Sequence, residues 1–293
     1  MSGTTEELRR RIGGAENLAG VVRSMKAIAA SSISQYERAV ESLHDYARTV
    51  ELGLAAGLCA SGARALLGPS SHRQVKIGAI VFGSDQGLVG RFNEVAVDFA
   101  WQAIGALPGQ IAKIWTIGER IGGLVEEMKS STPAKLQLAG SVEGITGLVG
   151  KLIVDLEAAL ERGTITEVHV FHNHPVSPTR YEPTGIRLLP FDRAWEQKAA
   201  QLRWPTRGPP EILEGAKAAL PAFLRSYLFV SLFQACAESL ASENACRLAA
   251  MQRAEKNIGS ILEELKRTYH QIRQESIDEE LFDVIAGFEA RRK

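Results

Sequence analysis

The chain has 293 residues with 34 basic and 34 acidic side chains, so its formal net charge is zero when histidine is neutral. Apolar residues make up 45% of it and charged residues 23%, which is typical of a globular protein with room for one large domain or two modest ones. This balance argues against a nucleic-acid-binding protein, because phosphate contacts require an excess of Lys and Arg. We therefore expect no nucleic acid among its partners.

No stretch predicts a membrane-spanning helix. The longest run without a charged residue, Phe99 to Ala112, contains Pro108 and falls short of the roughly 20 apolar residues required. Residues 1–11 lack the apolar segment of a secretory signal peptide. The cysteines are too few and too scattered for a disulfide framework or a zinc site, and we interpret them as reduced thiols: Cys59, Cys236 and Cys246. These features predict a soluble, cytosolic chain.

Residues 1–68 predict a long helix, from about Thr5 to about Cys59. No proline occurs before Pro69, and proline is the residue that most strongly interrupts helices. Apolar residues recur every seven positions at Val22, Ala29, Tyr36, Leu43 and Val50. A second row lies four residues behind the first, at Ile33, Val40, Ala47 and Leu54. Together the two rows form one apolar stripe that requires a partner helix.

Residues 69–191 predict a wound α/β domain, because strand and helix patterns alternate along them. The expected strands are residues 75–82, 111–117, 167–171 and 186–189, and the expected helices are residues 93–104, 119–129 and 146–161. Residues 192–221 contain Trp195, Trp204 and the pair Pro209-Pro210, which indicates a linker packed on the surface.

Residues 222–293 contain no proline and predict a second long helix. Its seam has the three- and four-residue spacing of a coiled coil: Ile258, Leu262, Leu265, Tyr269 and Ile272. The simplest partner for each terminal stripe is the other one. The predicted fold is therefore α/β, a long antiparallel two-helix coiled coil of the N- and C-terminal segments plus the central wound α/β domain.

Three segments were weighed as chemical sites. Gly83–Gly90 resembles a phosphate-binding turn but lacks the Gly-Lys-Ser/Thr ending of a P-loop, and we favour a glycine turn that lets strand and helix pack closely. His169, His172 and His174 have no Cys or carboxylate next to them, so we expect ordinary histidines at the sheet rim rather than a metal site. The acidic run 278–280 indicates a solvated or partner-facing helix surface. We expect no catalytic residue, cofactor or metal.

Several segments resemble the gamma subunit of F-type rotary ATP synthases, in the right order along the chain. Val22–Ser31 (VRSMKAIAAS) is similar to that family's N-terminal helix motif, and Ser84–Asn93 (SDQGLVGRFN) to its central motif. Two segments are similar to the family's C-terminal helix: Ala241–Ala245 (ASENA) with Arg247, Ala250 and Met251, and Ile277–Ala290. The residues ahead of this helix also fit the family's pattern: Pro210–Leu213 and Leu220-Pro221.

The sequence also departs from the family pattern. Gln86, Val89 and Arg91 replace Arg, Cys and Gly, while Asp278 and Phe288 replace Thr and Ala. These departures point to a divergent branch, such as the alternate complexes of this family.

The resemblance implies a rotor shaft whose terminal helices turn inside a hexamer of alternating alpha and beta subunits. Its α/β domain would lie with the epsilon subunit on the membrane rotor ring. It also implies a non-catalytic subunit, peripheral on the cytoplasmic face of the bacterial inner membrane.

By the same resemblance, six residues would contact partners. Met25 and Lys26 would face a moving lever of a beta subunit, and Arg273 and Gln274 would hydrogen-bond a catch loop of the hexamer. Asp278 stands where the family has the third residue of that set, and we expect its carboxylate to pair with Arg273 within the chain. Glu280 is the sixth expected contact. The apolar tip would turn in an apolar sleeve or, alternatively, form a buried helix end: Leu281, Phe282, Val284, Ile285 and Phe288.

Two other functions stay open. The central domain could be a small-molecule-binding α/β enzyme whose long helices serve only oligomerisation, or the chain could be a coiled-coil scaffold unrelated to rotation. An enzyme predicts a pocket with convergent polar groups beyond the strand ends, and a shaft predicts alpha and beta subunits as partners.

Overall fold

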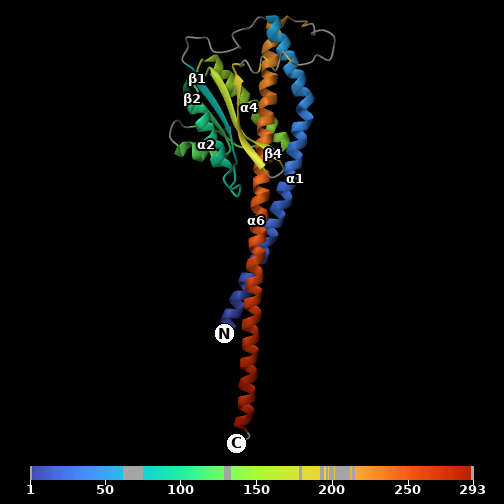
Figure 1. The fold of residues 1–293 in the computed structure, drawn as a ribbon, viewed down its shortest axis with the longest axis vertical. Helices are drawn as coiled ribbons and strands as arrows, with labels where there is room; N and C mark the ends of the chain where they lie inside the picture. The colour runs from blue at the N-terminus through green and yellow to red at the C-terminus, as the bar shows by residue number, and fades with distance from the viewer. Residues whose placement is uncertain are drawn as a thin grey trace. The chain divides into compact units, whose positions relative to one another are not determined.

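The computed structural model describes residues 2–61, 75–128, 133–177, 180–191 and 215–291, with isolated positions 195, 197, 201 and 212. The chain divides into two compact units, residues 30–246 and residues 1–29 with 247–293. Helices α1 (Ser2–Ser61) and α6 (Ala216–Ala290) contribute to both units (Figure 1). The division therefore differs from the segments expected from sequence, 1–68, 69–191, 192–221 and 222–293, because it follows packing rather than helix ends. Most of the expected linker lies outside the described residues.

Residues 30–246 contain a sheet of five described strands in the order β3-β2-β1-β4-β5. The strands are β1 (Lys76–Phe82), β2 (Gln110–Ile117), β3 (Ala134–Leu136), β4 (Glu167–Ser177) and β5 (Arg180–Leu189). Neighbours pair in parallel, except that β5 runs antiparallel to β4 at one edge. The wound α/β prediction is confirmed. The short strand β3 and the antiparallel edge were not expected.

Both faces of the sheet are covered. On β1, Ile77, Ala79 and Val81 belong to a cluster with apolar side chains of α2 (Phe92–Gly105) and α3 (Glu119–Glu127). Ile80 and Phe82 belong to a larger cluster with α4 (Val142–Glu161) and with parts of α1 and α6. This alternation follows from the two-residue period of a strand. A parallel sheet buried on both faces explains why β1 and β2 are nearly continuous apolar runs.

Within residues 30–246, α1 and α6 pack closely on each other. A Cβ atom on Gly53 would lie only 2.4 Å from the Phe223 ring, so a larger residue at this close approach would have to displace the ring. The α1 stripe is buried here as expected, at Tyr36, Val50 and Leu54. One described helix segment, Ala218–Gly287, has a window with mean hydropathy 1.3 and is thus apolar enough to cross a membrane, but 44% of that window is buried. Packing in the core is sufficient reason for this composition, since α6 supplies apolar side chains from Leu220 to Ala241 to the larger cluster.

Residues 1–29 and 247–293 form an antiparallel helix pair of their own. Val22, Met251 and Ile258 are its buried centre. Polar contacts extend the pairing along both helices: Lys26 with Glu255, Glu16 with Lys266, and Arg9 with Tyr269. Partner numbers fall on α6 as they rise on α1, so the helices run in opposite directions. The expected antiparallel coiled coil is confirmed.

Several elements are longer than the sequence predicted, above all α6, β4 and β5. Helix α6 begins at Ala216 and includes Pro221, whereas we expected the helix to start after that proline. Strand β4 continues beyond Phe171 to Ser177, and β5 begins at Arg180. Past Phe171, β4 pairs only with β5 and forms a two-stranded extension of the sheet. That extension reaches α6, and it carries the histidines described next.

Candidate functional site

The expected contacts on the N-terminal helix take part in the helix pair itself. Met25 is half-buried against the cluster of Val22, Met251 and Ile258. The Lys26 Nζ lies 2.5 Å from Glu255 Oε2, with about a third of each side chain exposed. Exposed apolar side chains lie on other positions of the same stretch, at Leu18, Val21 and Ile28. These three are thus more accessible to a partner than Met25 is.

The expected contacts on α6 are all exposed: Arg273, Gln274, Asp278 and Glu280. The expected pairing of Arg273 with Asp278 is not observed, since no ion pair joins them in the part of the chain that the structure describes. Residues five apart on a helix point about 140° away from each other, which keeps the two side chains on different faces. Their charged groups are therefore directed outward from this helix.

The apolar tip of α6 is not a buried helix end within this chain. Leu281, Phe282, Val284 and Ile285 are between 48% and 71% exposed. The side chain of Phe288 lies outside the described part. A run of exposed apolar side chains at a helix end marks an interaction surface, because water solvates it poorly.

The loop after β1 uses its polar groups within the chain. Asn93 Oδ1 accepts a hydrogen bond from the Ser84 backbone N–H, and its Nδ2 donates to Ser84 Oγ. Asp85 Oδ1 accepts from the Glu119 N–H at the start of α3, the position where a helix would bind an anion. Gly83 has no room for a Cβ, which would lie 2.4 Å from Cβ of Ile121. The glycine turn that packs strand against helix is confirmed.

A pocket of about 460 Å³ does lie beside this loop, lined by residues 87–90 and by parts of α2 and α3. Glu94, Glu119 and Glu127 line it together with a single cation among its lining residues, Arg120. Three carboxylates repel a phosphate group, so this pocket does not favour the nucleotide-binding alternative.

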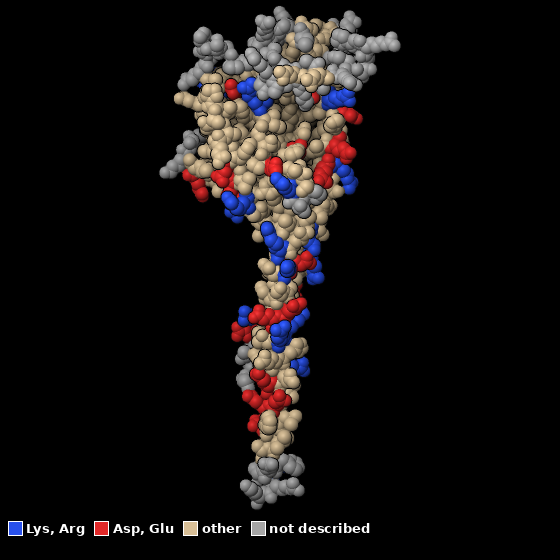
Figure 2. Space-filling model, viewed as in Figure 1, with Lys and Arg blue, Asp and Glu red and all other residues tan. Residues whose placement is uncertain are grey.

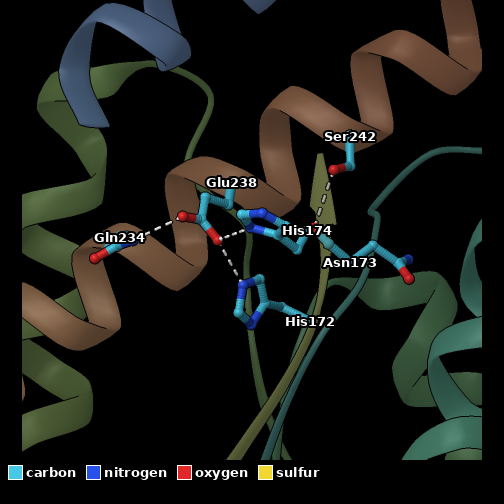
Figure 3. A network of polar contacts seen from close by, with 6 residues as sticks. All are labelled: His172, Asn173, His174, Gln234, Glu238 and Ser242. Carbon is cyan, nitrogen blue, oxygen red and sulfur yellow. Dashed lines mark hydrogen bonds and ion pairs between the residues drawn. The ribbon is translucent and has the colours of Figure 1, made fainter. Parts of the chain in front are cut away.

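Instead, the structure brings together a polar cluster that the sequence did not predict. His172 Nε2 lies 2.8 Å from Glu238 Oε2, and His174 Nδ1 lies 2.7 Å from the same oxygen (Figure 3). Gln234 Nε2 donates to the other carboxylate oxygen at 2.8 Å. His172 and Glu238 are buried, whereas the His174 side chain is half exposed. We call these residues the polar junction, because they join β4 to α6.

The sequence interpretation of the histidines was wrong in two respects. His172 and His169 are buried rather than at the rim, and a carboxylate does complete the group around His172 and His174. Glu238 is distant in sequence but lies in an otherwise apolar stretch of α6. A single acid in such a stretch is the signal that could have found it, since a buried carboxylate requires a partner.

The charge of the junction is set by its hydrogen bonds. Burial alone would raise the pKa of the Glu238 carboxyl, but hydrogen bonds from His172, His174 and Gln234 outweigh it and lower the pKa to about 2. Glu238 is therefore ionised at neutral pH. Neighbouring bonds hold the backbone in place: Ser242 Oγ donates to the Asn173 carbonyl, and Asn173 Nδ2 donates to the Phe92 carbonyl.

Surface charge is mixed on the face seen in Figure 2, where Lys and Arg are interspersed with Asp and Glu. No single basic field covers the described part of that face. This distribution agrees with the zero net charge of the chain.

Comparison with known proteins assigns the chain to a family. Residues 4–290 match the model of a family described as ATP synthase, that of the gamma subunit. The chain belongs to this family. The quoted motifs lie at structural positions that explain them, since Ser84 and Asn93 form the buried loop and Ser242 bonds the sheet extension.

Solved structures share the fold of this gamma-family chain. One from Euglena gracilis, described as mitochondrial ATP synthase, OSCP/F1/c-ring, rotational state 3, has a TM-score of 0.63 at 16% identity, covering 99% of this chain and 95% of its own. A second, the rotor of the Euglena gracilis mitochondrial ATP synthase in rotational state 1, has a TM-score of 0.58 at 15% identity, and the match covers 94% of this chain and 100% of that one. A third, the central stalk/c-ring of the Tetrahymena thermophila mitochondrial ATP synthase, has a TM-score of 0.56 at 18% identity, and the match covers 80% of this chain and 99% of that one.

Proposed function

We propose that this chain is the rotor shaft of an F-type ATP synthase, coupling rotation of an ion-driven ring to conformational change at catalytic beta subunits. In this role it is a non-catalytic subunit, and ATP is made or hydrolysed on its partners. Membership of the gamma-subunit family supports the proposal, as does the likeness to structures described as rotor and central stalk.

The observation that carries the proposal is the paired segment of residues 1–29 and 247–293. Its buried centre of Val22, Met251 and Ile258 is flanked by the Lys26–Glu255 and Glu16–Lys266 ion pairs. Two helices joined in this way resist twisting better than one, and their cross-section is asymmetric. Asymmetry is what a shaft requires, because each angular position then favours a different conformation of the surrounding subunits.

The partners we propose are the alpha and beta subunits of the catalytic hexamer, the epsilon subunit and the membrane rotor ring. Exposed Arg273, Gln274, Asp278 and Glu280 would contact the hexamer, and Lys26 would do so beside its bond to Glu255. The exposed apolar tip would turn within an apolar sleeve, where few directional bonds resist rotation.

The complex that contains such a subunit is peripheral to a membrane. We propose the cytoplasmic face of the bacterial inner membrane as the site, as the resemblance of the sequence to the gamma subunit implies.

The deciding experiment assembles the chain with candidate alpha and beta subunits and follows a probe fixed to the chain while the hexamer is immobilised. We expect stepwise, unidirectional rotation on addition of ATP. A hexamer that hydrolyses ATP at the same rate and with the same coupling when the chain is omitted would refute the proposal.

A charge reversal tests the proposed contact surface. Asp278 is exposed and makes no ion pair within the described chain, so Asp278→Lys leaves the stability of the isolated chain unchanged. In the assembled complex we expect weaker coupling of hydrolysis to rotation. Lys256→Gln, another exposed change on the same helix, is the matched control and should leave coupling intact. Equal coupling in both variants would exclude Asp278 from the contact.

A further inference from the structure

The polar junction places three metal-ligating side chains around one point. The ring nitrogens of His172 and His174 and a carboxylate oxygen of Glu238 all lie within 4.8 Å of one another. We propose that His172, His174 and Glu238 bind one Zn²⁺ ion, which fastens strand β4 to helix α6.

The local fold explains why the histidines converge. Residues two apart on a strand point to the same face, so His172 and His174 follow Val168 and Val170 toward the face that α6 covers. Asn173, between them, points the other way and bonds the Phe92 carbonyl. Glu238 approaches from α6, as Figure 3 shows. The site therefore consists of two ligands on a strand and one on a helix, both of which are fixed elements.

The ligand set selects the kind of ion. Imidazole nitrogen favours transition-metal ions such as Zn²⁺ over Mg²⁺ and Ca²⁺, which prefer oxygen ligands throughout. Two histidines and one carboxylate, with a water molecule at the fourth position, form a common zinc arrangement. The half-exposed His174 gives the ion a route from solvent and leaves room for that water.

The two nitrogen–oxygen distances require only a small adjustment. The ring nitrogens now lie 2.8 and 2.7 Å from Glu238 Oε2, as hydrogen-bond partners, and within 4.8 Å of each other. Ligands at about 2.0–2.1 Å from a tetrahedral zinc ion lie roughly 3.3 Å apart, so each nitrogen–oxygen separation must widen by about half an ångström. Rotation of the half-exposed His174 supplies part of this movement. Gln234 already holds the second carboxylate oxygen, as outer hydrogen bonds commonly do for metal ligands.

Proton placement sets a limit on affinity. Zinc bound at Nε2 of His172 leaves the ring proton on Nδ1, a buried atom that has no hydrogen-bond partner among the described residues. An unsatisfied buried donor of this kind weakens binding by roughly tenfold to a hundredfold. The site is therefore weaker than a structural zinc site with every ring nitrogen satisfied.

The test titrates the full-length chain, without an affinity tag, with Zn²⁺ and with Co²⁺ as a spectroscopic probe. We expect one equivalent to bind, a tetrahedral Co²⁺ absorption spectrum without thiolate charge-transfer bands, and a higher melting temperature with Zn²⁺. The absence of thiolate bands excludes a site built from the cysteines. A failure here leaves the rotor proposal unaffected, because that proposal does not depend on the ion.

Matched variants locate the site. His174→Gln removes a half-exposed ligand and should weaken binding at least about tenfold and abolish the thermal shift, as loss of a ligand does. His44→Gln removes an exposed histidine beside Asp45 and should change neither quantity. Equal binding by His174→Gln and the parent chain would overturn the proposal, as would failure of the parent chain to bind one equivalent. If His174→Gln does not fold, Glu238→Gln, which keeps the shape of the carboxylate, gives the same comparison.

Discussion

The close approach of α1 to α6 gives a sharp test, because two glycines one turn apart meet α6 differently. A Cβ on Gly53 would lie 2.4 Å from Cε1 of Phe223 and 2.9 Å from Cδ1. A Cβ on Gly57 would lie 3.4 Å from Leu220 Cδ1, an ordinary van der Waals contact. Replacement by alanine is therefore expected to change the free energy of unfolding in opposite directions at the two positions.

The magnitudes follow from two opposing contributions. Replacing a helical glycine by alanine favours the helix by about 1 kcal/mol. Overpacking a well-filled contact costs about 1–3 kcal/mol. Gly57→Ala should thus raise the free energy of unfolding by up to about 1 kcal/mol, whereas Gly53→Ala should lower it by up to about 2 kcal/mol.

Urea unfolding of the full chain measures both free-energy changes. The unfolding is monitored by far-ultraviolet circular dichroism and by the fluorescence of the buried Trp115. Repeating Gly53→Ala in a Phe223→Leu background removes the ring and should turn the change stabilising. This double-mutant cycle isolates the contact from helix propensity. If Gly53→Ala and Gly57→Ala raised the midpoint equally with Phe223 in place, the inferred close approach would be refuted.

Three further predictions use the same chain. Gly83→Ala should lower the free energy of unfolding by about 1–3 kcal/mol, measured by urea denaturation, because the new Cβ would overlap Ile121, and no change would disprove this packing. Burial lowers the pKa of His169 from 6.5, more than its hydrogen bond to Glu167 raises it. Below pH 6.5 the unfolded chain therefore binds more protons at His169 than the folded chain does. The contribution of His169 to stability is complete above that pH and is lost as the pH falls toward the pKa of His169 in the folded chain. His169→Gln should flatten that part of the thermal stability–pH curve, and an unaltered slope would contradict the assignment. Val284→Ser changes an exposed tip residue and should alter the free energy of unfolding of the isolated chain by less than about 0.5 kcal/mol. In the assembled complex it should reduce ATP-driven rotation. Unchanged rotation would place Val284 outside the contact.

The long helices could be predicted because their signal is repeated over many turns. Val22, Ala29 and Tyr36 are buried at the seven-residue interval that the sequence displays, and Ile258 is buried in the opposite seam. A regular apolar stripe on a proline-free chain leaves few alternative structures. The first strands were equally clear, since a parallel sheet buried on both faces requires continuous apolar runs.

The edge of the sheet could not be predicted in the same way. Strand β5 contains Pro183 and Gly185, which the sequence rules exclude from central strands but which an edge strand tolerates. The extension of β4 contains Pro175 and polar residues, because it faces a helix rather than a second sheet layer. Such residues look like a loop until the position of α6 is known. The polar junction could not be predicted for the same reason, since Glu238 meets the histidines only through tertiary structure.

The polar junction and the contact between Gly53 and Phe223 together fix the register of α6 on the sheet domain, which apolar burial alone does not. Apolar burial is nearly non-directional, so sliding α6 by one turn, about 5.4 Å, would preserve much of its contact with the sheet. That shift would leave the Glu238 carboxylate buried away from His172 and His174, at a cost of several kcal/mol. It would also move Phe223 away from the space that Gly53 leaves for it. One register of α6 on the sheet domain is therefore strongly favoured. A helix that transmits torque has to keep that register, because a slipping contact would lose rotation before it reached a partner.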